Sequence, residues 1–333
     1  MKKRVAAVAA VTGLALHVLV GCSGGVSGSG ASGTSGNLDF PKKNIKIIVP
    51  YDAGGGVDIT TRILAEAAGK DYFNGKSLIV ENMPGGGAVI GHTAVANAEA
   101  DGYTLLAYTS AVVNNPLLKE VTYTLDSFKT LGMVCFDPEI LVVPPGSPYQ
   151  TYEEFIAYAK EHTVKVATPG HSTSHHIAAM QFAKENGLNF EYLHNDSASV
   201  QMQQLMGGHC DAAWMAVGET INQVNDKTII ALAQAGEERN PNIPDVPTFI
   251  ELGGTMVAGA FRGYACPANV PDEVYQYLTE EMDKLITSEA FIQGMEAGGI
   301  PYSYKNAADF QDYAYQCSED LKPLVNELKA ASQ

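Results

Sequence analysis

Short apolar runs of strand length alternate along the chain with longer segments in which apolar residues recur at helical spacing. The strand-like runs are rich in aliphatic residues, as in IKIIV, TLLAYT, EILVV, VKVAT and DAAWMAV. The segments between them, such as TYEEFIAYAKEH and IAAMQFAKENG, place apolar residues every three or four positions. This alternation predicts an α/β fold with mostly parallel sheets, and in such folds ligands bind at the carboxyl ends of the strands.

Composition and charge narrow the classes of partner. The chain has 333 residues, of which 46% are hydrophobic, so it is long enough for two domains with separate cores. Lys and Arg number 21 against 37 Asp and Glu, which gives a net charge of −16. After the first residues there is no basic run, so nucleic-acid binding is not expected. The overall field repels anions, and an anion site would therefore have to be built locally.

The N-terminus has the features of an exported lipoprotein. MKKR is positively charged, a short apolar stretch follows, and the segment 19–22, Leu-Val-Gly-Cys, resembles a bacterial lipobox. Residues 23–37 are mostly Gly and Ser, which is typical of a flexible tether. We predict a signal peptide at 1–21, lipidation of Cys22, a tether to residue 38, and an extracytoplasmic protein anchored to the bacterial cell membrane. An ordinary secretory signal with a chance cysteine is the alternative.

Four later cysteines, Cys135, Cys210, Cys266 and Cys317, lack the CxxC spacing of a zinc ribbon or a redox motif. In an exported protein they could pair, but the spacing favours scattered buried thiols.

Three glycines stand after the first strand in VPYDAGGGVD, residues 49–58. A Walker loop needs Lys and Ser or Thr after its last glycine, whereas Val57 and Asp58 follow Gly56. The dinucleotide pattern GxGxxG also fails, because Ile59 occupies the third glycine position. The remaining interpretations are a small anion held by backbone N–H groups at a helix N-terminus and a tight packing turn. Asp58 either orients the first helical turn or contacts the ligand.

A second candidate loop, TPGHSTSHH at 168–176, also lies between a strand and a helix. Its hydroxyls can cap the helix or bind a carboxylate. His171 and His175 are four residues apart, a zinc-like spacing, with His194 and Asp196 as loose further ligands. The loop lacks the final glycine of a GxSxG nucleophile elbow. A second anion cradle is the favoured interpretation, and a zinc receptor and a secreted hydrolase are the alternatives.

Several segments together resemble the substrate-binding proteins of tripartite tricarboxylate transporters, the Bug-type receptors. These segments are VPYDAGGGVDITTR, ENMPGGGAVIGHTAVANAEADGYTLL, RNPNIPDVPTFIELG and FRGYACPANVPDEV. They occur in the family's order and at similar spacing, and the resemblance extends from Phe40 to the end of the chain.

The resemblance implies a periplasmic-binding-protein fold with two α/β lobes, a two-crossover hinge and a ligand cleft between the lobes. It places residues 39–137 and 245–333 in the first lobe and residues 138–244 in the second. It also implies a receptor for a small organic carboxylate that passes its ligand to membrane permease subunits, with no catalysis, cofactor, metal or nucleic acid.

The same resemblance implies four ligand-binding loops that act mainly through backbone amides and hydroxyls. The residues it places there are Tyr51, Asp52, Ala53, Gly54, Gly55, Gly56, Asp58, Thr109, Ser110, Gly170, His171, Ser172, Ser174, His175, Asn195, Asp196 and Ser197. The chain departs from the family pattern at Asp52, where proline is usual, and at Pro169 and His171, where glycines are usual. The usual Tyr-x-Gly is also replaced at 195–197. The added Asp and His favour a ligand with one carboxylate and a donor or aromatic part.

Overall fold

The computed structural model describes residues 38–331. The predicted signal peptide, the lipidation site Cys22 and most of the tether lie outside the described residues. Within residues 38–331, no helix combines the length and the apolar character needed to cross a bilayer.

The described strands form one mixed sheet in the order β2-β1-β3-β9-β4-β7-β5-β6, with β8 and β10 also paired to β4. The strands are β1 (Ile45–Val49), β2 (Leu78–Asn82), β3 (Thr104–Thr109), β4 (Phe128–Val143), β5 (Val164–Thr168), β6 (Phe190–His194), β7 (Ala212–Ala216), β8 (Ile230–Gln234), β9 (Gly259–Pro267) and β10 (Tyr302–Lys305). Strands β1, β2 and β3 are parallel to one another, and so are β5, β6 and β7. The predicted parallel α/β organisation is confirmed within each group.

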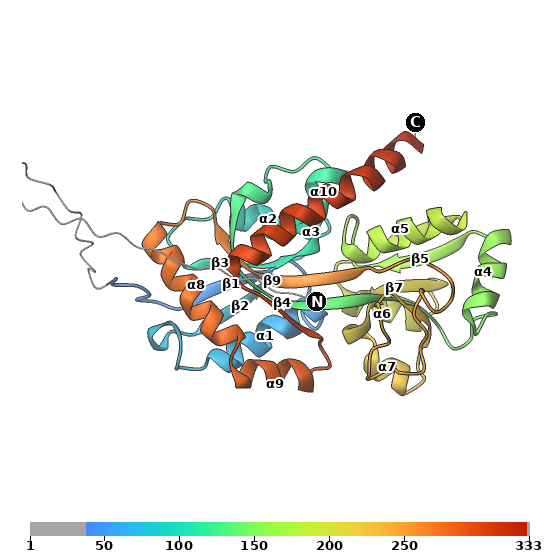
Figure 1. Ribbon diagram of the computed structural model, residues 1–333, viewed down its shortest axis with the longest axis horizontal. Coiled ribbons are helices and arrows are strands. Elements are labelled where there is room, and N and C mark those ends of the chain that lie inside the picture. Colours follow the sequence, from blue (N-terminus) through green and yellow to red (C-terminus); the bar gives the residue numbers. More distant parts are fainter. Residues whose placement is uncertain (1–37, 332–333) are drawn as a thin grey trace, which may run out of the picture. The chain divides into compact units, whose positions relative to one another are not determined.

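The long strand β4 belongs to both groups of strands. Its residues 128–138 pair with β9, and its residues 139–143 pair with β7 and β8 (Figure 1). Thr248 bridges to Gln234 of β8, and Phe249 and Met256 pack in the core of the second group. The predicted lobe boundaries at 137/138 and 244/245 stay a prediction, and these contacts favour a later second crossing.

Helices connect and cover the strands. They are α1 (Gly56–Ala68), α2 (Val89–Ala96), α3 (Ser110–Leu118), α4 (Tyr152–Glu161), α5 (Ser174–Asn186), α6 (Ala198–Met206), α7 (Ile221–Asn225), α8 (Asp272–Ile286), α9 (Glu289–Ala297) and α10 (Ala307–Ala331), with short 3₁₀ turns η1 (Phe73–Gly75), η2 (Leu125–Ser127) and η3 (Val217–Glu219). Helices α1, α3, α5 and α6 begin between one and seven residues after the ends of β1, β3, β5 and β6. Their N-termini therefore lie at the carboxyl ends of β1, β3, β5 and β6.

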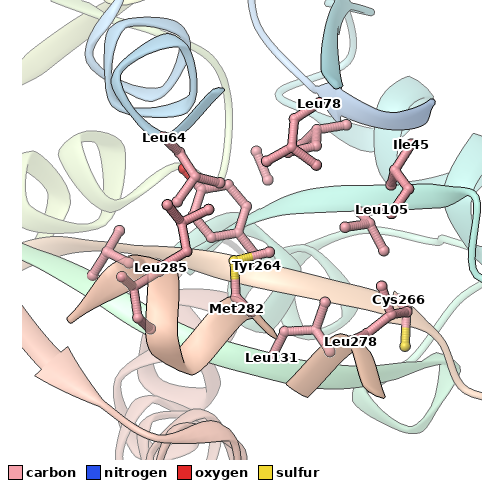
Figure 2. Close-up of a cluster of buried hydrophobic side chains, with 14 of the residues drawn as sticks. Ile45, Leu64, Leu78, Leu105, Leu131, Tyr264, Cys266, Leu278, Met282 and Leu285 are labelled. Atoms are coloured by element: carbon pink, nitrogen blue, oxygen red, sulfur yellow. The ribbon is translucent and has the colours of Figure 1, made fainter. Parts of the chain in front are cut away.

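Alternate residues of the strands enter cores on opposite faces of the sheet, because successive side chains of a strand point in opposite directions. Ile47 and Leu105 pack with α1, α8 and α9, whereas Ile48 and Leu106 pack with α2, α3 and α10. Figure 2 shows the first of these cores, where Leu64, Tyr264, Met282 and Leu285 are among the labelled side chains.

The second group of strands has its own cores. Trp214 is fully buried, and its ring packs against Phe182 and Phe249 in the core. Cys135, Cys210, Cys266 and Cys317 are all free, and the first three are buried. The expectation of scattered thiols therefore holds for this part of the chain.

Candidate functional site

Asp58 orders the glycine loop between β1 and α1. Its Oδ2 accepts hydrogen bonds from Gly54 N and Arg62 Nε, both at 2.9 Å, and its Oδ1 accepts one from Asn82 Nδ2 at 2.9 Å. Burial opposes ionisation of Asp58, but these donors outweigh it and lower the pKa of the carboxyl below its ordinary value. Asp58 therefore orients the glycine loop and the first turn of α1, one of the two roles considered from the sequence. Its carboxylate accepts the hydrogen bond of the Gly54 N–H, which is then not available to a ligand.

The start of α1 retains free backbone donors. Among the described residues, the N–H groups of Gly55, Gly56 and Val57 have no hydrogen-bond acceptor. A Cβ added at Gly56 would lie 2.5 Å from both Arg262 Nη2 and Glu219 Oε1, so glycine is needed for their close approach. Free N–H groups at a helix start favour an anion.

The loop before α5 also leads into a helix whose first backbone N–H groups are free. Thr173 caps the helix by accepting from His176 N, and Ser172 N donates to His176 Nδ1 at 3.0 Å. Within the described chain, the N–H groups of Ser174 and His175 have no acceptor. This second loop therefore also presents helix N-terminal donors, as the cradle interpretation expected.

Helix α3 supplies a third N-terminus. Thr109 is its N-cap, Tyr51 Oη lies 3.5 Å from Thr109 Oγ1, and Ser110 Oγ accepts from Phe261 N at 3.1 Å. Tyr51, Thr109 and Ser110 are all buried.

The starts of α1, α3 and α5 meet at one small cavity, here called the anion cavity. It has a volume of about 30 Å³ and is lined by Tyr51, Val57, Thr109, Ser110, Ala111, Pro169, Thr173, Ser174, His175, Glu219, Ala260, Phe261 and Arg262. Loops separated by more than 50 residues in the sequence thus contribute to one site. Three helix N-termini present backbone donors to this cavity, and the Arg262 guanidinium in its lining is paired with Asp137 and Glu219.

A buried chain of alternating charges lies beside this cavity. His175 Nδ1 is 2.6 Å from Glu139 Oε2, and His175 Nε2 is 3.2 Å from Glu219 Oε2. Arg262 Nη2 is 3.1 Å from Glu219 Oε1 and 3.2 Å from Asp137 Oδ2. All five side chains are at most 8% exposed, and Glu139 Oε1 has no hydrogen-bond partner among the described residues.

The pKa values follow from this pairing. Burial lowers the pKa of His175, but the charges of Glu139 and Glu219 outweigh it and raise that pKa to about 10. Burial raises the pKa of Glu219, but His175 and Arg262 lower it to about 2. The pKa of Asp137 rises to about 6, because burial outweighs the attraction of Arg262. His175 is therefore a cation at neutral pH.

Sequence reasoning missed Arg262 and Glu219. The signal for Arg262 is present, because a single arginine stands inside the apolar strand GAFRGYACP. A charged residue in a run of this kind is buried only with partners. Nothing in the local sequence marks Glu219 as its partner, which lies 43 positions away.

A second cavity, here called the polar cavity, adjoins the same ion pair. It has a volume of about 360 Å³, and its lining includes Gly54, Gly55 and Gly56, Ala198 and Ser199 at the start of α6, and Glu219 and Arg262. Ser197 is the N-cap of α6, and its hydroxyl lies 2.8 Å from Ser199 Oγ. Ser199 Oγ in turn donates to Ala53 O at 3.3 Å. The glycine loop therefore faces the start of α6.

The other predicted site residues line neither of these two cavities. Asp52 and Asp196 are absent from both linings, and Asn195 Nδ2 donates to Thr168 O and Leu193 O. Gly170 packs on Gly87, where an added Cβ would lie 2.8 Å from the Gly87 Cα.

His171 and Ser172 lie away from the cavities as well. Ser172 Oγ is 2.6 Å from His171 Nδ1, and the His171 ring packs against those of His176 and His194 at centroid distances of 4.8 and 5.5 Å. Burial lowers the pKa of His176 to about 3 and that of His194 to about 4, with neighbouring positive groups adding to the effect.

The zinc alternative does not match this geometry. Both ring nitrogens of His175 are engaged by Glu139 and Glu219, whereas His171 belongs to a different cluster. Across residues 38–326, no group of three or more His, Cys, Asp or Glu side chains is arranged to hold a metal ion.

Two sets of parallel strands that share a long strand, with helix N-termini gathered at one cavity, are the architecture of the periplasmic-binding-protein fold. The chain is similar to the structure of the periplasmic binding protein BugD, with a TM-score of 0.82 and 24% identity, covering 86% of this chain and 98% of that one. It is also similar to MatC from Rhodopseudomonas palustris with bound malate, with a TM-score of 0.79 and 21% identity, covering 86% and 100%. The predicted fold class is confirmed.

The chain belongs to the family of tripartite tricarboxylate transporter receptors, because the family's model matches residues 60–330. A Cupriavidus necator relative, the UPF0065 protein in the gbd 5' region, is 30% identical over 306 residues, covering 88% of this chain and 89% of that protein. The predicted family is confirmed.

Proposed function

We propose that the protein is an extracytoplasmic receptor that binds a small organic carboxylate and delivers it to the membrane subunits of a tripartite tricarboxylate-type transporter. The observation that carries this proposal is the anion cavity, where Arg262 and the N-termini of α1, α3 and α5 meet. A volume of about 30 Å³ suits one carboxylate group rather than a whole metabolite.

The donors that line the cavity favour a carboxylate, and the one acid in the lining, Glu219, is paired with His175 and Arg262. Free N–H groups of Val57, Ser174 and His175 are donors that a carboxylate oxygen accepts, and Arg262 adds a charge-assisted partner. The donors are held by folded helices, so little ordering is required on binding. The bound malate of MatC is a carboxylate of the proposed class.

The remaining parts of the proposal come from the family and the sequence. Family membership supports a receptor rather than an enzyme and a permease as the partner. The lipobox ending at Cys22 and the Gly/Ser segment at 23–37 support export and a lipid anchor.

Replacing one backbone donor tests the proposal. Ser174 is the first residue of α5, and Thr173 before it has φ −71° and ψ 166°, which a following proline tolerates. Ser174→Pro therefore removes an N–H with little effect on the helix, and Ser174→Ala removes the hydroxyl alone. Glu289→Pro, at the first position of α9 after Ser288 (φ −71°, ψ 148°), is the matched control away from both cavities.

Calorimetry with a panel of carboxylates, after a thermal-shift screen, gives the readout. Loss of one hydrogen bond to a charged group costs about 1.5–3 kcal/mol, so Ser174→Pro should weaken binding roughly ten- to a hundredfold. Ser174→Ala should have a smaller effect, and Glu289→Pro should bind like the wild type. Equal affinity of Ser174→Pro and wild type, or equal affinity for the acid and its amide, would contradict the proposal.

A further inference from the structure

A large groove adjoins the anion cavity on the side of α5 and α10. It has a volume of about 530 Å³ and shares Ser110, Ser174 and Phe261 with the anion cavity. The two spaces therefore meet at the starts of α3 and α5. Residues of strands β4 and β9 also contribute to its wall.

The inner end of the groove is polar. Ser110 and Ser174 mark the junction with the anion cavity, and Asn114 lies one turn further along α3. Asn114 also lines the groove and is only 6% exposed. Its amide and the two serine hydroxyls can pair with a polar group of a ligand at this end.

The middle of the groove is apolar, whereas Gln181, Lys184, Glu185 and Asp320 line it toward the C-terminal part of α5 and on α10. Its wall includes Phe136, Ile177, Val257, Tyr313, Leu321 and Leu324. Val257 is 43% exposed, and Phe136, Ile177 and Tyr313 are partly buried. An apolar surface next to a small set of polar groups is typical of a site for an amphipathic small molecule.

The buried Glu219–Arg262 ion pair determines which neighbouring space can hold the part of the ligand beyond its carboxylate. The anion cavity holds little more than a carboxylate, so the rest of the ligand must enter a neighbouring space. The polar cavity lies beyond the Glu219–Arg262 pair, whose atoms are 3.1 Å apart and buried. The path to the groove passes only the uncharged residues Ser110, Ser174 and Phe261. Parting a buried ion pair is the more costly route.

We infer that the ligand is a monocarboxylate with an apolar alkyl or aryl tail, whose acid group lies in the anion cavity and whose tail lies in the groove beside α5 and α10. This inference rests on the proposed function and adds the class of ligand. In a ligand of the length of hexanoate, a second carboxylate would lie beside apolar side chains, because Lys184 is ten residues, or about 15 Å, further along α5 than Ser174. The groove therefore discriminates against dicarboxylates of this length.

Calorimetry on the mature protein at pH 7 tests the inference with propanoate, butanoate, hexanoate and 3-phenylpropanoate. Each added methylene should strengthen binding roughly three- to fourfold through burial of apolar surface. Adipate, which has the length of hexanoate but a second carboxylate, should bind at least about tenfold more weakly than hexanoate.

A substitution that fills the groove provides a second test of the inference. Val257→Trp should weaken hexanoate binding about tenfold or more and leave propanoate within about twofold, because the added ring occupies the tail's space. Ile250→Trp is the matched control, because Ile250 is equally exposed, at 43%, and does not line the groove.

The outcomes separate this inference from the proposed function. If acids bind but affinity does not change with tail length, or if Val257→Trp leaves the length dependence intact, the groove assignment is wrong and the carboxylate receptor stands. If no acid in the series or in a wider dicarboxylate panel binds, both are overturned.

Discussion

The pairing of His175 with two buried carboxylates predicts that the protein loses stability as the pH rises above neutrality. Burial lowers the pKa of His175, but Glu139 at 2.6 Å and Glu219 at 3.2 Å outweigh it and raise the pKa from the ordinary 6.5 to about 10. Between these two values the folded protein binds one more proton than the unfolded chain. The resulting stabilisation is complete below pH 6.5 and is lost as the pH rises through 10.

The size of the effect follows from the two pKa values of His175. At 1.36 kcal/mol per pKa unit, the interval between 6.5 and about 10 corresponds to at most about 5 kcal/mol. That is a large part of the roughly 5–15 kcal/mol that separates folded and unfolded states of typical domains. His175→Gln should therefore reduce stability by several kcal/mol at pH 6.5 and by much less near pH 10.

Urea denaturation of the wild type and of His175→Gln between pH 6.5 and 9.5 measures the difference. His162→Gln is the matched control, because His162 is exposed and stacks only on Tyr158. The free energy of unfolding of the wild type and of His162→Gln should fall more steeply with pH than that of His175→Gln. Equal slopes in all three proteins, or an imidazole of His175 that titrates near pH 6.5 by NMR, would refute the reasoning.

Three further predictions concern the glycine loop and the anchor. Asp58→Asn weakens the acceptor of Gly54 N and should lower the free energy of unfolding by about 1–3 kcal/mol in urea titrations, and an unchanged midpoint would contradict this. Gly56→Ala places a Cβ 2.5 Å from Arg262 Nη2, so carboxylate affinity by calorimetry should fall at least about tenfold, whereas wild-type affinity would show that Arg262 does not contribute. Cys22→Ala should release the protein from membranes in a fractionation assay, and membrane retention would exclude the lipid anchor.

Local patterns in the sequence were sufficient to predict each strand–turn–helix segment. A strand followed by a glycine turn and an amphipathic segment predicts that the helix start lies at the strand's carboxyl end, as in β1 and α1. The same reasoning correctly placed Ser174 and His175 at the start of α5. The cap at Thr173 and the bonds of Asp58 to Gly54 and Arg62 join residues at most four positions apart, whereas the bond of Asp58 to Asn82 spans 24 positions.

The positions of the buried charged side chains relative to one another could not be predicted from local sequence patterns. The Arg262–Glu219 contact joins residues 43 positions apart, and the contact of His175 with Glu219 joins residues 44 apart. Neither separation corresponds to a helical or strand period, so no local pattern brings these residues together. Their contact depends on β4 and β9 passing between the two groups of strands.

The sequence alone thus determined the family, the α/β elements and the helix N-termini that present backbone donors, because these depend on short-range spacing and on characteristic segments. The tertiary structure decided which N-termini share a cavity, that the charged pair Arg262 and Glu219 stands between that cavity and the next, and that His175 is a buried cation rather than a metal ligand. These properties depend on desolvation and on distances between segments remote in sequence, and both are defined only once the strands are paired.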